Sequence, residues 1–285
     1  MTSLDKVRPV SEVKPPSGVR SPSEVRPPHE VRSPHEVRPP LSVCLLAYNE
    51  EEELVRAIES VAWADEIVVV VDAKSEDGSE QVARRMASRV ECRVYEGDVA
   101  QKRYATSLAK HDWVLILDPD EVVTEELGQS IRAALESPGP SAYQLNRATY
   151  HLGRWIRHGD FYPDWKLRLF RKSQARWVGR DPHGRVEVPG KLGDLKGDLE
   201  HYSYRDLADQ VDRIQFFSGQ AAEALFREGA KFRLQDLILR PPARFLRTYF
   251  LRAGFRDGLP GFVISAASAF YVFLKYAKLW EKTRA

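Results

Sequence analysis

The sequence DWVLILDPDE, residues 112–121, is the clearest guide to the architecture of this chain. The apolar residues 114–117 are typical of a central parallel strand covered on both faces, since such strands show no polar alternation. Asp118 and Asp120 follow the strand directly. Ligands of open α/β sheets bind just past the carboxyl ends of the strands. This Asp-x-Asp (DXD) motif therefore predicts a site for Mg²⁺ or Mn²⁺, with a solvated acidic turn as the simpler alternative.

Apolar runs and helical patterns alternate before this stretch. Short apolar runs occupy residues 41–47, 67–71 and about 91–95, and helical patterns lie between them and from about 98 to 110. This order predicts an α/β fold with a mainly parallel sheet and right-handed crossovers. Asn49, Asp72 and Asp118 end three of the strands, so we expect them on one rim of the sheet.

The composition limits the kind of protein. The chain has 285 residues with 43% hydrophobic content, which supports a sizeable core, and its net charge of +2 gives no overall signature of nucleic-acid binding. No apolar signal-peptide core precedes the first predicted strand. Cys44 and Cys92 lie in strand-like runs and are interpreted as small core residues. We therefore expect a cytoplasmic, reduced protein.

Three segments are predicted. Residues 1–40 form a proline-rich arm with a hexapeptide repeat that offers one valine per unit, too little apolar surface to offset the entropy of ordering. This arm is expected to be disordered. Residues 41–204 form the α/β domain. Residues 205–285 are predicted to form C-terminal amphipathic helices.

The ordered set of motifs AYNEE, ADEIVVVVDAKSEDGS, QKRYA and DWVLILDPDE resembles family 2 glycosyltransferases of the GT-A (nucleotide-diphospho-sugar transferase) fold. The later segments LGRWIRHGDFYPDWKLRLFRK and LEHYSY are similar to the β-glucosyltransferases of lipopolysaccharide core biosynthesis. The resemblance covers residues 41–204 well. It implies an inverting transfer of a sugar, expected to be glucose from UDP-glucose, to a lipid-linked saccharide such as the lipopolysaccharide inner core, with Mg²⁺ or Mn²⁺ as cofactor.

The resemblance also assigns roles to individual residues. The residues implied in donor binding are Tyr48, Asn49, Glu50, Asp72, Asp77, Gln101, Lys102 and Asp118. The implied metal ligands are Asp118, Asp120 and His183, with His201 as a second candidate histidine. Lys74 and Arg103 stand where the family usually has other residues, which leaves the exact donor open.

The acceptor half is predicted from a cationic and aromatic segment and one acid. Arg154, Trp155 and Arg157 offer surfaces suited to sugar rings and anionic groups, although a packed loop is an equal alternative. An inverting transfer needs one base to take the proton of the acceptor hydroxyl. Asp164 is the predicted base, and an ion pair with Lys166 or Arg168 is the structural alternative.

The C-terminal segment interleaves arginines with aromatic side chains. Its apolar run, residues 262–274, is shorter than the roughly 20 residues that span a bilayer. The pattern predicts peripheral association with the cytoplasmic face of the inner membrane, or packing against the α/β domain. Arginine with aromatics also suits nucleic acid, but we expect no such partner.

Two rival functions differ from a glycosyltransferase. A sugar nucleotidyltransferase needs a glycine-rich basic loop after the first strand, and the sequence there, AYNEEEE, is acidic. A non-catalytic, membrane-associated scaffold could retain the GT-A fold, and it would lack metal-dependent nucleotide binding.

Overall fold

The structure, a computed structural model, describes residues 38–137, 139–179 and 184–284. By its internal contacts, Arg38–Ala285 forms one compact unit. His183 and nearly all of the predicted arm lie outside the described residues.

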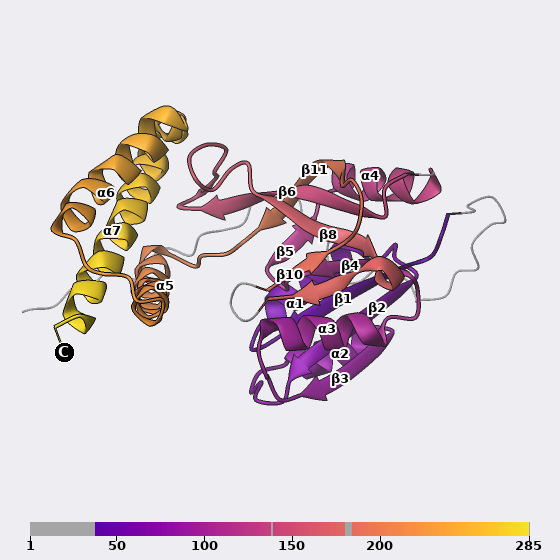
Figure 1. The fold of residues 1–285 in the computed structure, drawn as a ribbon. Coiled ribbons are helices and arrows are strands. Elements are labelled where there is room, and N and C mark those ends of the chain that lie inside the picture. Colours follow the sequence, from indigo (N-terminus) through magenta and orange to yellow (C-terminus); the bar gives the residue numbers. More distant parts are fainter. Residues whose placement is uncertain (1–37, 138, 180–183, 285) are drawn as a thin grey trace, which may run out of the picture. The chain divides into compact units, whose positions relative to one another are not determined.

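The first four strands are parallel and alternate with helices, as predicted (Figure 1). Their order in the sheet is β3-β2-β1-β4, with β1 hydrogen-bonded to both β2 and β4. The strands are β1 (Leu41–Ala47), β2 (Glu66–Asp72), β3 (Arg89–Arg93) and β4 (Trp113–Leu117), and the helices between them are α1 (Glu51–Ser60), α2 (Ser79–Met86) and α3 (Asp98–Leu108).

Alternate side chains of these strands enter two separate cores. Val43 and Leu115 pack on the face that carries α1, α2 and the later helix α4 (Glu125–Glu136). Val68 and Ile116 pack on the other face, against α3. Burial on both faces is the reason that the strands are continuously apolar in sequence. Cys44 is buried as predicted, whereas Cys92 is exposed on the edge strand β3, so that part of the prediction was wrong.

Beyond β4 the sheet becomes mixed. Strand β8 (Trp165–Arg171) runs antiparallel to both of its neighbours, β4 and β6 (Ala142–His151). Strand β11 (Gly193–His201) is parallel to β6, and β5 (Glu121–Val123) closes the edge antiparallel to β11. This pairing places Glu121 opposite His201. The short strand β7 (Arg154–Trp155) pairs with β6, and β9 (Arg176–Val178) forms a separate ribbon with β10 (Arg185–Glu187).

The C-terminal segment is helical, as expected. Helices α5 (Leu207–Arg227), α6 (Leu234–Leu246) and α7 (Gly258–Lys282) pack through a small cluster that includes Ala222, Tyr276 and Leu279. A π-helical turn η2 (Arg247–Leu251) and a 3-10 turn η3 (Gly254–Asp257) join α6 to α7. Helix Gly254–Lys282 is long and apolar enough to cross a membrane by length and composition, a test that the core helix of a soluble protein also passes. The apolar run considered in the sequence prediction, residues 262–274, is only part of this longer helix, and peripheral association of the segment with a membrane stays a prediction.

Candidate functional site

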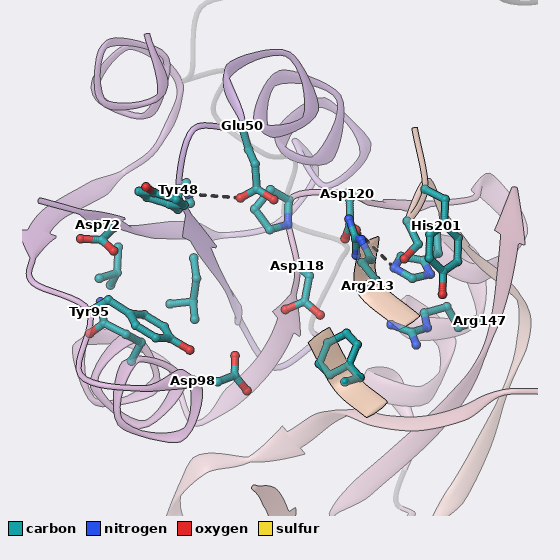
Figure 2. Close-up of a pocket in the computed structure, with 18 residues that line it drawn as sticks. Tyr48, Glu50, Asp72, Tyr95, Asp98, Asp118, Asp120, Arg147, His201 and Arg213 are labelled. Atoms are coloured by element: carbon teal, nitrogen blue, oxygen red, sulfur yellow. Dashed lines mark hydrogen bonds and ion pairs between the residues drawn. The ribbon is translucent and has the colours of Figure 1, made fainter. Parts of the chain in front are cut away.

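A pocket of about 450 Å³ lies at the carboxyl ends of β1, β2 and β4 (Figure 2). Its volume is within the range of small-molecule sites, and its place is the one expected for ligands of an open α/β sheet. Predicted site residues that line it are Tyr48, Glu50, Asp72, Gln101, Asp118 and Asp120. The buried carboxamide oxygen of Gln101 has no hydrogen-bond partner among the described residues. A ligand donor in the pocket would satisfy this oxygen.

Asn49 and Asp77, which were also predicted to serve the donor, hold the pocket wall instead of lining it. The side-chain oxygen of Asn49 accepts the backbone N–H of Glu76 at 2.8 Å. The Asp77 carboxylate accepts the N–H groups of Glu51 and Ser79, both at 3.0 Å. These bonds tie the loop after β1 to the loop after β2. Direct contact of either side chain with a donor stays a prediction.

Glu50 is an acid whose proton is held unusually tightly. Burial raises its pKa to about 7, and the nearby carboxylates of Asp120 and Asp118 add to the rise. The N–H of Tyr48, which donates to the carboxylate at 3.1 Å, opposes the shift. Burial is the main cause of this raised pKa, and the carboxylates of Asp120 and Asp118 make a smaller contribution to it.

Asp120 and His201 form the pair best suited to hold a metal. The Asp120 Oδ2 and His201 Nε2 atoms lie 3.3 Å apart, and both residues line the pocket (Figure 2). The other ring nitrogen of His201 contacts Thr149 Oγ1 at 3.3 Å, which fixes the orientation of the ring. A carboxylate with an imidazole fits Mn²⁺ better than Ca²⁺. Among the described residues, no group of three or more acidic, histidine or cysteine side chains is arranged to hold a metal ion.

Asp118, the other residue of the DXD motif, has a different environment. Its Oδ2 atom accepts from Arg168 at 2.6 Å, and its Oδ1 atom lies 3.0 Å from Lys102 Nζ. Although burial alone would raise the pKa of Asp118, the charges of Arg168 and Lys102 hold it well below its usual range. Asp118 is therefore a permanent anion that organises two cations beside the pocket.

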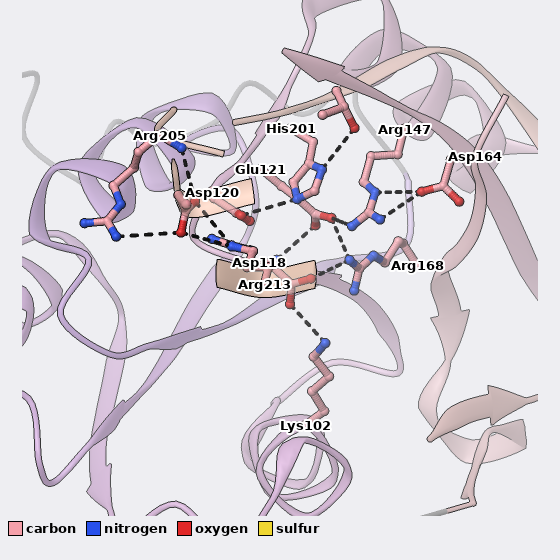
Figure 3. A network of polar contacts seen from close by, with 12 residues as sticks. Lys102, Asp118, Asp120, Glu121, Arg147, Asp164, Arg168, His201, Arg205 and Arg213 are labelled. Atoms are coloured by element: carbon pink, nitrogen blue, oxygen red, sulfur yellow. Dashed lines mark hydrogen bonds and ion pairs between the residues drawn. The ribbon is translucent and has the colours of Figure 1, made fainter. Parts of the chain in front are cut away.

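An alternating chain of acids and bases runs from Asp118 to Asp164 (Figure 3). Its centre is Glu121, whose side chain is fully buried. Glu121 Oε1 lies 2.6 Å from Arg168 Nη2 and 3.2 Å from Arg147 Nη1. Arg168 continues to Asp118, and Arg147 continues to Asp164 at 2.8 Å. The chain joins the predicted metal motif to the predicted base.

Asp164 immediately precedes β8 and is firmly held. Its Oδ2 atom accepts from Arg147 Nε at 2.9 Å, and its Oδ1 atom lies 2.9 Å from Lys166 Nζ. The N–H of Asp164 donates to the Asn146 side chain at 2.8 Å. The expected alternative, an ion pair with Lys166, is present, while Arg168 pairs with other acids. Asp164 does not line the pocket itself, but Arg147 does.

Sequence reasoning missed Glu121, Arg147 and Arg213 as site residues. Glu121 and Arg147 meet only through the pairing of distant strands, so no local spacing announces their contact. Arg213 lies on α5 and lines the pocket beside Phe217, with its guanidinium 5.3 Å from the centre of the Tyr204 ring. The i, i+4 pair that it forms with Asp209 is ordinary for a solvated helix face and gives no hint of a site.

The three residues predicted to bind the acceptor have different side-chain partners. Trp155 packs with Tyr150 and Tyr202, with ring centres 5.2 and 5.4 Å away. Arg157 pairs with Asp198, and Arg154 donates to the backbone oxygen of Asp257 at 3.0 Å. The Trp155 ring is packed against these other rings, while the side chains of Arg154 and Arg157 remain 46% and 41% exposed. Binding of an acceptor by any of the three stays a prediction.

The loop around these residues and the η2–η3 junction each contribute one buried carboxylate that accepts hydrogen bonds from the other. Asp257 of η3 accepts the N–H groups of Arg157 and His158 at 3.1 and 2.8 Å. In the opposite direction, Asp160 of the loop accepts from Thr248 and Arg252, both at 2.8 Å. Both acids are almost fully buried. This reciprocal arrangement fixes the loop to the C-terminal helices.

Comparison with known proteins agrees with this geometry. Residues 42–188 match the family model described as glycosyl transferase family 2. An uncharacterised glycosyltransferase of Rickettsia typhi is 32% identical, over 85% of this chain and 87% of its own. The lipopolysaccharide core biosynthesis glycosyltransferase LpsC of Rhizobium meliloti is 28% identical, over 85% and 92%. The mannosyltransferase PcManGT of Pyrobaculum calidifontis, solved with GDP-mannose and Mn²⁺, has a TM-score of 0.51 at 16% identity, covering 86% and 88%. The predicted GT-A fold and the family resemblance are both confirmed.

Proposed function

Because the chain belongs to glycosyltransferase family 2, we propose that it is an inverting, metal-dependent enzyme that transfers glucose from UDP-glucose to a lipid-linked saccharide. The acceptor would be a lipopolysaccharide inner core. The observation that carries the proposal is the pocket in which the Asp120–His201 pair, the anion Asp118 and the unpaired oxygen of Gln101 meet. The relative LpsC, named for lipopolysaccharide core biosynthesis, supports the class of acceptor.

The donor would lie along the carboxyl ends of the first strands. Tyr48, which is exposed, and Asp72 both line the pocket and would contact the nucleoside. Arg147 and Arg213 supply positive charge on the opposite wall, where a diphosphate would need it.

A divalent cation would be held by Asp120 and His201, with Asp118 beside them. When bound, Mg²⁺ or Mn²⁺ would neutralise charge on the departing nucleoside diphosphate. Asp118 keeps both of its oxygens in ion pairs with Arg168 and Lys102, so its proposed part is to hold these two cations near the diphosphate as well as to approach the metal.

The proposed chemical step is a single displacement. The acceptor hydroxyl oxygen forms a bond to the anomeric carbon while the bond from that carbon to the diphosphate oxygen breaks, and the diphosphate leaves with the electron pair. Asp164 takes the hydroxyl proton. Arg147 holds one Asp164 oxygen, and the other is free to accept once the half-exposed Lys166 moves aside.

The acceptor and the membrane complete the proposal. A lipid-linked saccharide is available only at a bilayer, and the arginine-rich C-terminal helices with exposed aromatic side chains suit an anionic surface. We place the enzyme on the cytoplasmic face of the inner membrane, where nucleotide sugars are made.

The test is calorimetric titration of UDP-glucose, GDP-mannose and ADP-heptose, each with and without Mn²⁺. Wild-type protein is expected to bind UDP-glucose tightly only with Mn²⁺. Asp120→Asn is expected to weaken this binding at least tenfold, because one charged ligand of the cation is lost. Asp164→Asn should bind the donor normally and lose at least a hundredfold in transfer, since the base acts on the acceptor.

Asp194→Asn is the matched control, because Asp194 is an exposed carboxylate of β11 in the same sheet. It should change neither binding nor transfer. Binding that ignores both Mn²⁺ and Asp120 would refute the metal assignment. Absence of binding by every donor would favour a scaffold that kept the fold.

A further inference from the structure

Exposed apolar side chains are concentrated in the C-terminal helices. Of the 22 large hydrophobic residues that are exposed in the described part of the chain, 17 lie at or beyond Leu207. A concentration of exposed apolar side chains in one part of a chain marks a place of interaction. Leu251 is 83% exposed and Leu259 is 74% exposed, and these are the two highest values among the 22.

Leu251 is the last residue of η2 and Leu259 is the second residue of α7. Residues 247–259, which comprise η2, η3 and the start of α7, are called the tip segment here. Phe250 and Phe255 of the same segment are also half exposed. Every exposed charge of the tip segment is positive: Arg247, Arg252 and Arg256 are exposed, with Arg252 also paired to Asp160, while its one acid, Asp257, is 1% exposed. Among the described residues, Arg247 and Arg256 form no ion pair.

The partner can be identified from this chemistry. Exposed leucine and phenylalanine side chains interspersed with arginines, without an exposed acid, match an anionic bilayer: the apolar groups enter the acyl boundary and the guanidinium groups meet phosphates. A protein partner would more often offer the tip a shaped, mixed-charge surface. The irregular η2 and η3 turns project these side chains at the end of the α6–α7 pair, where a bilayer surface could receive them.

We propose that the tip segment inserts into the anionic leaflet and that the reciprocal carboxylates Asp160 and Asp257 transmit its position to the loop at 154–160. The inference rests on the proposed function in one respect, that the acceptor is lipid-linked. The bonds of Asp257 to Arg157 and His158, and of Asp160 to Arg252, hold that loop to the inserted segment. The tip segment thereby fixes the loop near the level of the headgroups, where the sugar of a lipid-linked acceptor lies.

The experiment is flotation of the full chain with vesicles of phosphatidylethanolamine and phosphatidylglycerol, compared with phosphatidylcholine alone. Wild-type protein should float only with the anionic vesicles, and less so at high salt. Leu251→Asp should weaken binding at least tenfold. Its matched control is Leu239→Asp, because Leu239 is 63% exposed on α6 of the same helix pair but lies outside the tip segment. The control should change binding less than twofold.

Equal losses in the two variants would show that the whole helix pair lies flat, and would overturn insertion by the tip. Protein that stays in the membrane after carbonate extraction would show that α7 spans the bilayer, which also overturns it. If Leu251→Asp converts a dimer to a monomer in light scattering without changing flotation, a second copy covers the tip segment and the proposal fails. Unchanged far-ultraviolet circular dichroism is expected in both variants, because both side chains are exposed.

Failure of the proposed function would be seen separately. Transfer to detergent-solubilised acceptor, and hydrolysis of UDP-glucose, should be unchanged in Leu251→Asp, while transfer to acceptor in vesicles should fall with the loss of binding. If wild-type protein binds anionic vesicles but transfers no sugar, the proposed transferase function is refuted and the proposed membrane-binding role of the tip segment stands. If the protein is active but does not bind vesicles, only the proposed membrane insertion of the tip segment is refuted.

Discussion

In strands β1, β2 and β4, apolar side chains alternate between two faces, and nearly all of them are buried. In the helices after Asp206, the same kinds of side chain recur at helical spacing, but many remain exposed. The sheet finds its cover within the chain, because α1, α2 and α4 pack on one face and α3 on the other. The C-terminal helices cover one another only in part. An amphipathic pattern thus predicts an element and its apolar side, but the partner of that side depends on the rest of the fold.

The largest expected effect of a polar substitution is at Glu121, inside the sheet region. Glu121→Gln removes the buried anion that Arg147 and Arg168 share, so two guanidinium groups lose a charged partner in a dry environment. Breaking such a network costs about 3 kcal/mol of unfolding free energy. Urea unfolding monitored by circular dichroism would measure it. Transfer activity should fall as well, because the Arg147 contact with Asp164 loosens.

The control for this prediction is Glu136→Gln, which changes an exposed glutamate at the end of α4. Its cost should stay within about 0.5 kcal/mol, as for most surface substitutions. A Glu121 variant as stable as this control would mean that the acid–base chain contributes little, and the contrast between the two regions would then rest on apolar packing alone.

Much of the sheet region could be predicted from the sequence because its signals are local. A strand such as β4 is apolar throughout since both of its faces are covered, and the acids that end it are adjacent in the chain. The contact of Glu121 with Arg147 could not be predicted, because it depends on the pairing of β5, β6 and β11 over long separations. Asp120 was predicted from the DXD motif, and His201 was named as a candidate metal ligand only through the family resemblance, since no local pattern joins the two. Arg213 reaches the pocket through tertiary placement of α5, which no periodicity encodes.

A smaller and pH-dependent effect on stability is expected at Glu50, because burial in the sheet region disfavours the charged form of its carboxyl group. The folded carboxyl keeps its proton up to about pH 7, whereas the unfolded one releases it near 4.5. Between these values the folded state binds more protons, so stability falls as pH rises. The shift corresponds to about 3 kcal/mol, reduced by partial solvent screening to about 1 to 2 kcal/mol. Glu50→Gln should therefore gain stability over wild type from pH 5 to pH 8, measured by urea unfolding in EDTA.

Glu59→Gln, an exposed change on the same helix, should show no such trend and serves as the control. Added Mn²⁺ should reduce the Glu50 effect in part, because a cation beside Asp120 and Asp118 offsets the share of the raised Glu50 pKa that comes from their charges and leaves the larger share that comes from burial. A stability difference that is the same at pH 5 and pH 8 would contradict the raised pKa of Glu50.

The smallest effect is expected on the exposed face of α7. Phe270 and Phe273 stack on each other with ring centres 6.5 Å apart, and they keep 44% and 43% of their surface exposed. Phe273→Ala should cost less than about 1 kcal/mol, against the roughly 3 to 5 kcal/mol of a fully buried phenylalanine such as Phe170. Urea unfolding at two protein concentrations tenfold apart would measure it.

If the face is uncovered in solution, the cost is the same at both concentrations. A wild-type midpoint that rises with concentration, and no longer does so in Phe273→Ala, would mean that a second copy covers this face, since association stabilises by mass action. The two regions would then bury their apolar surface alike, one within the chain and the other between chains.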